Sequence, residues 1–157
     1  MAKGIISDNL HYGIYIQNWW ELCKFDQTHI NSIPYQIFMS VNCCLNSKNF
    51  AITILNNEQT QNPCFHCLCD GIDSGTQPSA TAAINNTYNQ IFGNKTKHSG
   101  LVVMGFDNEA IVHELVADVS FISIFIRLDK ILIVVSQIGV LFRKGYMMLV
   151  QDIFLHL

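Results

Sequence analysis

The sequence predicts an α+β domain in which a mostly antiparallel sheet is covered by two or more helices. Two neighbouring segments, 35–41 and 50–55, alternate apolar and polar side chains with the period of a strand. A helical repeat follows at 80–91, and a short capped apolar segment lies at 108–115. The chain has 157 residues, half of them apolar, which is enough to bury a single core.

The strand predictions rest on alternation and on short apolar runs. Tyr35–Val41 and Phe50–Leu55 alternate, and the polar link Asn42–Asn49 between them contains turn-forming residues. We therefore expect an antiparallel hairpin with a loop of moderate length. Further strands of the same sheet are expected at Cys64–Cys69, Leu101–Met104 and Val119–Ile126.

Two helices are predicted from their start and stop signals. Pro78 suits the first helical position, with Thr76 or Gln77 as the cap, and Gly93 ends the helix. Its apolar stripe consists of Ala80, Ile84, Tyr88 and Ile91.

The second helix is expected to begin after a cap at Asp107 or Asn108. Glu109 complements its positive end, and three apolar side chains form its buried face. These are Ile111, Val112 and Leu115.

Composition and charge limit the function classes. Only 13% of the residues are charged, the net charge is −3 and the pI is about 6.0, so the clustered basic side chains of a nucleic-acid-binding surface are missing. The first nine residues contain no apolar signal core, which makes a reducing nuclear or cytoplasmic compartment the expectation. The six cysteines are then expected to remain thiols.

The apolar C-terminal part sets a domain boundary. We expect a domain over residues 1–128 and an apolar tail over 129–157. The run Ile131–Phe142 is twelve residues long, short of the roughly 20 that a membrane-spanning helix needs. Extending it upstream would place Arg127, Asp129 and Lys130 inside the bilayer, so a membrane span is disfavoured.

One segment has the composition of a metal site. The spacing from Cys64 to Cys67, with His66 and Cys69 nearby, would let thiolate and imidazole ligands face one zinc ion. A second well-spaced pair is missing, because Cys43 and Cys44 are adjacent and Cys23 stands alone. The favoured interpretation is a strand with cysteines as small buried hydrophobes, so no metal ligand is assigned.

No catalytic or cofactor-binding residue is assigned either. His66 and His113 could act as bases, but neither has a nucleophile at a recognisable spacing, and His113 is expected in a solvated or interface position. The turns Ser74–Gly75 and Ser99–Gly100 lack the spacing of a phosphate-binding loop. Trp19–Trp20 is expected in the core, with a partner-binding surface as the alternative.

The order of elements from Gln77 to Leu115 resembles the C-terminal half of the FY-rich region. The matching pieces are Gln77–Pro78, the helix with Ala83, Ile84, Tyr88 and Ile91, then Ser99–Gly100, Met104–Gly105–Phe106–Asp107 and Ile111–Leu115. Upstream, Tyr35–Val41, Phe50–Ala51–Ile52 and the polar loop to Pro63 are similar to the strand pair that joins the two halves of that region. The resemblance covers about residues 30–116.

This resemblance implies a compact α+β module of nuclear, chromatin-associated proteins, such as trithorax-type lysine methyltransferases. Such a module serves assembly and implies no catalytic, metal or cofactor residue. The expected function is therefore non-enzymatic protein–protein interaction in the nucleus, with a protein partner in a chromatin-linked complex and no direct contact with nucleic acid or membrane. The alternatives are a membrane-peripheral or membrane-inserted protein using Val119–Val150 and a small zinc-binding module at residues 64–69.

Overall fold

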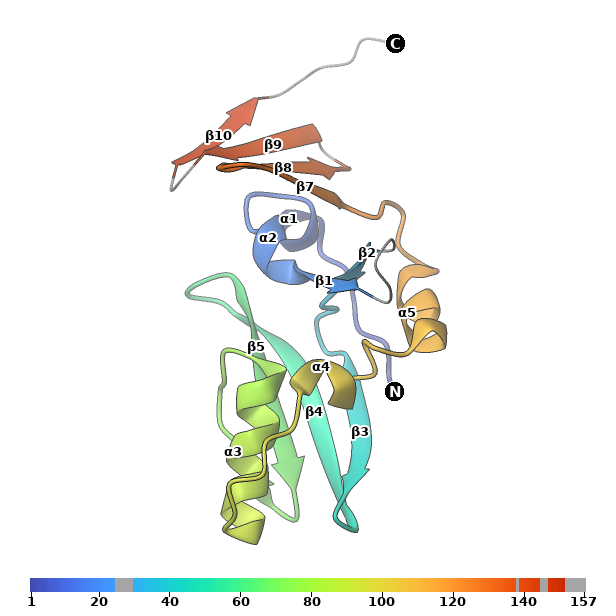
Figure 1. Cartoon of the computed structure of the whole chain (residues 1–157), viewed down its shortest axis with the longest axis vertical. Coiled ribbons are helices and arrows are strands. Elements are labelled where there is room, and N and C mark those ends of the chain that lie inside the picture. Colours follow the sequence, from blue (N-terminus) through green and yellow to red (C-terminus); the bar gives the residue numbers. More distant parts are fainter. Residues whose placement is uncertain (25–29, 138, 145–146, 152–157) are drawn as a thin grey trace.

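In the described residues, three antiparallel sheets, each built from strands that are consecutive in sequence, form the framework (Figure 1). The structure is a computed structural model that describes residues 1–24, 30–137, 139–144 and 147–151. The strands are β1 (Trp20–Lys24), β2 (Ile30–Pro34), β3 (Ser40–Leu45), β4 (Lys48–Asn57), β5 (Asn62–Cys69), β6 (Ile72–Asp73), β7 (Ile124–Leu128), β8 (Ile131–Ser136), β9 (Gly139–Lys144) and β10 (Met147–Gln151). The helices are α1 (Asp8–His11), α2 (Ile16–Trp19), α3 (Ala80–Phe92), α4 (Gly100–Val103) and α5 (Glu109–Val116). The predicted α+β class is confirmed.

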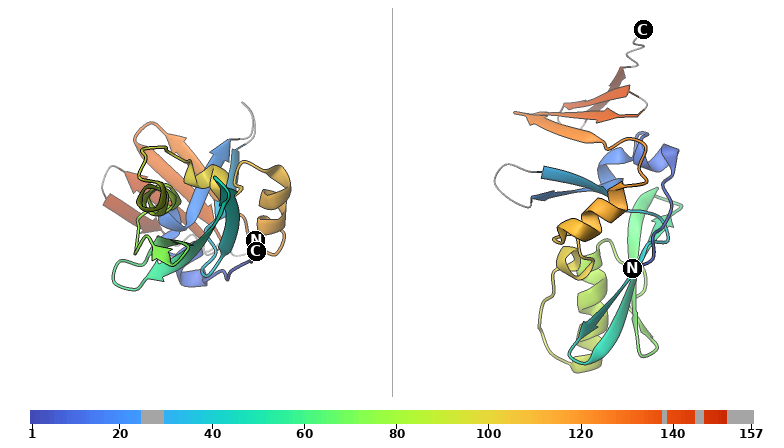
Figure 2. Two further views of the ribbon diagram at one scale, coloured as in Figure 1. Left: turned by 90° about the horizontal axis from the view of Figure 1, so that it is seen from below. Right: turned by 90° about the vertical axis from the view of Figure 1, so that its right-hand side faces the viewer.

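The elements are stacked along the long axis of the molecule. The sheet β3-β4-β5-β6 and helix α3 lie at one end, and the sheet β10-β9-β8-β7 lies at the other (Figures 1 and 2). Between them lie α1, α2 and the β1–β2 hairpin. The buried core runs through this middle layer, where Tyr12, Ile16 and Trp19 have almost no exposed surface.

The prediction of one sheet is wrong. In the described part of the chain, each strand pairs only within its own group, and these groups are β1–β2, β3 to β6, and β7 to β10. The physical reason is local: antiparallel strands joined by short turns close on their sequence neighbours at little entropic cost.

The predicted hairpin around Asn42–Asn49 is confirmed, with a tighter turn than expected. β3 and β4 are joined by Asn46 and Ser47, both with positive φ, as in the two-residue turns that suit strand twist. On β4, Phe50, Ile52 and Ile54 are fully buried, and they follow the predicted alternation.

The predicted strand Tyr35–Val41 is wrong over most of its length. β2 ends at Pro34 and β3 begins at Ser40, and Ile37 makes only an isolated bridge to Ile5. Phe38 interrupts the pleat because its φ is +67°, in the left-handed region that a bulky side chain rarely adopts.

Helix α3 confirms the first helix prediction except at its start. The cap is Ser79, whose side chain accepts a hydrogen bond of 3.1 Å from the N–H of Ala82, and Pro78 precedes the cap. The helix therefore starts later than a cap at Thr76 or Gln77 would require. Gly93 ends the helix with φ +62°, as expected.

The predicted strand Leu101–Met104 is wrong, because these residues belong to the short helix α4 and its C-terminal cap. Gly100 starts the helix where the chain crosses α3 closely: a β-carbon there would lie 2.2 Å from the backbone nitrogen of Thr81. A short apolar run in a sequence does not distinguish a strand from a helical turn. Here the run forms a helical turn, and this turn begins at Gly100, where the chain lies close against α3.

Helix α5 confirms the second helix prediction. The Asn108 side chain accepts hydrogen bonds from the N–H groups of Ala110 and Ile111 and is the cap.

The predicted strand Val119–Ile126 is wrong at its N-terminal half, since β7 starts only at Ile124.

The predicted division after residue 128 falls in the turn between β7 and β8. Leu128 and Ile131 face each other across this turn, so both predicted parts contribute strands to one sheet. That residues 1–128 fold alone stays a prediction.

Candidate functional site

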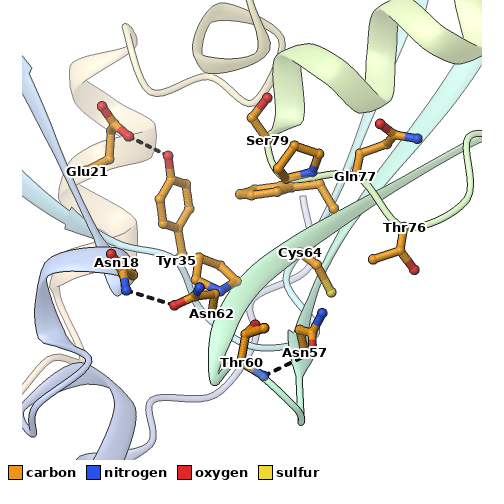
Figure 3. Close-up of a pocket in the computed structure, with 13 residues that line it drawn as sticks. Asn18, Glu21, Tyr35, Asn57, Thr60, Asn62, Cys64, Thr76, Gln77 and Ser79 are labelled. Carbon is orange, nitrogen blue, oxygen red and sulfur yellow. Dashed lines mark hydrogen bonds between the residues drawn. The ribbon is translucent and has the colours of Figure 1, made fainter.

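A recess of about 580 Å³ lies where α2, β1, the β4–β5 turn and the segment before α3 meet (Figure 3). We call it the polar recess, because eight of its 13 lining residues carry an amide or hydroxyl group. Its lining residues are Asn18, Glu21, Tyr35, Asn57, Thr60, Asn62, Pro63, Cys64, Phe65, Thr76, Gln77, Pro78 and Ser79.

The wall between β5 and α3 is fixed by backbone pairing. The N–H of Phe65 donates to the carbonyl of Gln77, and the N–H of Gln77 donates back, both over 2.9 Å. The Gln77 side chain in turn donates to the carbonyl of Ser74 over 2.7 Å. This bridge holds the segment before α3 against the end of the sheet.

The opposite wall joins α2 to the β4–β5 turn. Asn18 Nδ2 donates to Oδ1 of Asn62 over 2.7 Å, and the indole N–H of Trp19 donates to the carbonyl of Gln61 over 2.9 Å. In the turn itself, Asn57 Oδ1 accepts from the N–H of Thr60. An Asn side chain that bonds its own turn in this way is a common turn former.

Tyr35 and Glu21 are hydrogen-bonded to each other in the lining of the recess. Among the described residues that line it, this is the only hydrogen-bonded pair that includes a carboxylate. The Tyr35 hydroxyl donates to Oε2 of Glu21 over 2.5 Å (Figure 3). Burial, and next the hydrogen bond to Glu21, raise the pKa of Tyr35 well above its usual value. Tyr35 therefore remains a phenol donor over the physiological pH range, with Glu21 as its acceptor.

The chemistry of the recess suits binding. Its lining combines neutral donors and acceptors with the carboxylate of Glu21, and it contains no lysine, arginine or histidine. Burial raises the pKa of the Cys64 thiol, which disfavours the thiolate that a nucleophile requires. Neutral polar or cationic groups fit such a site better than anions do.

The cysteine segment forms strand β5, as the favoured interpretation predicted. Phe65, Cys67 and Cys69 are buried on the side covered by α3, whereas His66 and Leu68 point to the other face and are partly or largely exposed. Burial raises the pKa of Cys67 to about 11. No group of three metal-ligating side chains lies close enough together to hold an ion in the part of the chain that the structure describes.

The other residues that the sequence singled out lie apart from the recess or only at its edge. Trp19 and Trp20 are buried, which confirms the core prediction, and His113 is exposed on α5. His66 lies at 3.0 Å from the hydroxyl of Thr76, on the outside of the sheet. Sequence reasoning missed Glu21 and Tyr35, which come from separate segments and carry no local signal of their contact.

A second surface lies on the β7–β8 hairpin. Its outward side carries six aliphatic side chains, which we call the apolar face: Ile124, Ile126, Leu128, Ile131, Ile133 and Val135. The opposite side of the hairpin packs inward, where Val134 is fully buried and the Ser136 hydroxyl donates to the carbonyl of Tyr12 over 3.1 Å.

Comparisons with protein-family models, with curated proteins and with solved structures find no match for this chain. Over the described residues, no helix has both the length and the apolar composition to cross a membrane.

Proposed function

We propose that this protein is a non-enzymatic protein–protein interaction module and that the apolar face is its main contact surface. The observation that carries the proposal is a row of three exposed aliphatic side chains on β7, Ile124, Ile126 and Leu128, each more than 40% exposed. Single exposed aliphatic residues are common, but a continuous row on a sheet face typically marks an interaction site.

The register of the hairpin makes this row a surface. Ile124 faces Val135, Ile126 faces Ile133 and Leu128 faces Ile131 across the strands, so two rows of aliphatic side chains lie side by side. Asp129 and Lys130 at the turn are exposed and border this surface with charge. An apolar centre with a polar rim is the usual anatomy of a protein interface.

The polar recess supports the same function. It lies between the middle layer and the sheet β3-β4-β5-β6 and offers amide and hydroxyl groups, with Glu21 as its one carboxylate. A partner segment that carries a basic or amide side chain would find matching groups there.

The resemblance to the FY-rich region gives the proposed setting. Its members are nuclear and chromatin-associated, so we propose a protein partner in a chromatin-linked complex. No basic surface is required of the chain for such a role, because the partner would supply any contact with nucleic acid.

The experiment compares the full chain with the double variant Ile126→Lys, Leu128→Lys in quantitative affinity purification from nuclear extract. We expect a defined set of chromatin proteins to be retained by the original chain and lost from the variant. The control is Leu68→Lys, which places one lysine at a comparably exposed aliphatic residue on β5.

Two results would overturn the proposal. The first is equal retention by the original chain and the double variant. The second is binding of the original chain, but not of the double variant, to vesicles of phosphatidylcholine and phosphatidylserine without any protein partner, which would favour a membrane-peripheral protein.

A further inference from the structure

A groove of about 370 Å³ separates the beginning of β7 from the β1–β2 hairpin. Its apolar walls come from Leu22 on β1, from Val112 and Val116 on α5, and from Ile122 just before β7 and Ile124 at its start. Among these side chains, 44% of Leu22 and 46% of Ile122 are open to solvent. We call it the edge groove.

β7 is an edge strand. It pairs with β8 on one side, and the described residues make no backbone hydrogen bond across its other side. Of the four strands in its sheet, β7 lies nearest to the β1–β2 hairpin (Figure 2). An unpaired strand edge offers a row of N–H and C=O groups to another extended chain.

The groove also contains a buried polar atom without a partner. Ser123 lines it, is 1% exposed, and its hydroxyl makes no hydrogen bond within the described structure. A buried hydroxyl in this state is unfavourable unless another group satisfies it. A donor or acceptor from a bound chain would do so.

We propose that the edge groove binds an extended, uncharged segment of a partner protein, which adds as a strand to β7 and hydrogen-bonds to Ser123. This rests on the proposed function and gives its mode of contact. Main-chain hydrogen bonds to β7 supply affinity, and alternate side chains of the segment enter the apolar groove, as in strand addition generally.

The side chains that line the edge groove determine which kind of partner segment can bind there. None of the side chains that line the groove is ionisable, and its only polar side chains are Asn31, Ser32 and Ser123. A charged side chain entering there would lose its hydration without gaining a counter-charge. The favoured segment therefore alternates small polar and β-branched side chains.

The shape of the groove favours a single strand over a second copy of this chain. It is walled on both sides, by β7 and by the β1–β2 hairpin, with α5 contributing to its lining. A single extended strand needs less room between these walls than a helix about 10 Å across or the edge of a second folded sheet does.

The test uses the full chain and a fluorescent peptide, acetyl-Thr-Val-Thr-Val-Thr-Val with a soluble tail, in an anisotropy titration. The control peptide has the same side chains but is N-methylated at alternate residues, which removes main-chain donors. We expect the first peptide to bind and the second to bind at least about tenfold more weakly, since each lost hydrogen bond in a dry site weakens affinity strongly.

Two variants locate the contact. Ile124→Lys places a charge at a half-exposed position of the groove and should weaken peptide binding at least about tenfold, whereas Leu68→Lys on β5 should leave it unchanged. Ser123→Ala should weaken peptide binding several-fold while leaving the stability of the free protein unchanged or higher, because it deletes an unsatisfied group.

The proposal is overturned by equal binding of both peptides, by unchanged binding by Ile124→Lys, or by absence of peptide binding. A dimer of the full chain that Ile124→Lys dissociates while no peptide binds would assign β7 to a second copy. If no peptide binds but the double variant of the apolar face still loses its nuclear partners, strand addition is wrong and the proposed function stands. If the partners are also retained, both are wrong.

Discussion

The His11 imidazole bridges two segments of the core: its Nε2 donates to the carbonyl oxygen of Tyr35 over 3.0 Å, and its Nδ1 accepts from the N–H of Ser7 over 3.0 Å. The ring has no exposed surface and packs against Trp19, with 5.1 Å between ring centroids. The neutral tautomer that carries its proton on Nε2 makes both of these bonds, and the protonated ring would instead donate from Nδ1 to the carbonyl oxygen of Ser7, which also lies at 3.0 Å.

Stability should therefore fall in mild acid. Burial lowers the pKa of His11 below its ordinary value of 6.5. The hydrogen bonds that the protonated ring can donate to the carbonyl oxygens of Tyr35 and Ser7, and the charge of Asp8, oppose this only in part. Below about pH 6.5, His11 binds a proton in the unfolded chain but stays neutral in the folded chain. The free energy of unfolding therefore drops by up to about 1.4 kcal/mol per pH unit. Urea unfolding between about pH 5 and about pH 8 measures this slope.

Replacing His11 separates its contribution from that of other groups. His11→Gln should lower stability at about pH 7 and flatten the slope below about pH 6.5, because the titrating ring is gone. His113→Gln is the matched control, since His113 is exposed on α5. An unchanged slope in His11→Gln would show that another group causes the pH dependence.

The Tyr35–Glu21 pair should contribute measurably to stability. Tyr35→Phe removes a hydrogen bond of 2.5 Å to a carboxylate and should lower the free energy of unfolding by about 1.5–3 kcal/mol. A double-mutant cycle with Glu21→Gln isolates the pair. A coupling energy near zero in that cycle would mean that the two side chains act independently.

The parts that could be predicted from the sequence are those fixed by local signals. Period-two alternation located β4, because Phe50 and Ile52 both point into the core, and the side-chain cap of Asn108 located α5. Gly93 marked the end of α3, since its left-handed φ suits glycine best. In each of these cases, a few residues that are neighbours in sequence determine the local structure.

The remainder depends on contacts between distant residues. Phe38 adopts a left-handed φ inside an alternating segment, close to Gln36, whose side chain donates to the carbonyl of Leu115 and accepts from the N–H of Gly4. No local sequence pattern predicts that the strand is interrupted at this residue. The polar recess likewise draws its lining from segments far apart in the chain, such as those of Asn18 and Ser79.

The crossing of α3 and α4 should tolerate no β-carbon at Gly100. In Gly100→Ala the new methyl group would lie 2.2 Å from the backbone nitrogen of Thr81, so the backbone of one or both segments would have to move. We expect the free energy of unfolding to fall by about 3 kcal/mol, as for severe overpacking. Thermal and urea unfolding both measure this loss.

Gly93→Asn is the control for that variant. Gly93 has a positive φ, but a β-carbon added there would meet no atom within 4 Å, and Asn adopts this conformation at modest cost. Its effect should be about 1 kcal/mol or less. Equal stability of Gly100→Ala and the original chain would mean that α4 can shift away from α3.

Thiol reactivity should separate the six cysteines by their position in the fold. Cys44 is exposed at the end of β3, whereas Cys64, Cys67 and Cys69 are buried in β5. Burial raises the pKa values of Cys23 and Cys67 to about 11, so at about pH 8 only about one in a thousand of these thiols is ionised. With a disulfide reagent at that pH, we expect one rapid phase from Cys44, and the buried β5 thiols should react only as fast as the domain opens. Cys44→Ser should abolish the rapid phase without changing the slow ones, whereas a rapid phase that persists in this variant would place one of the other thiols at the surface.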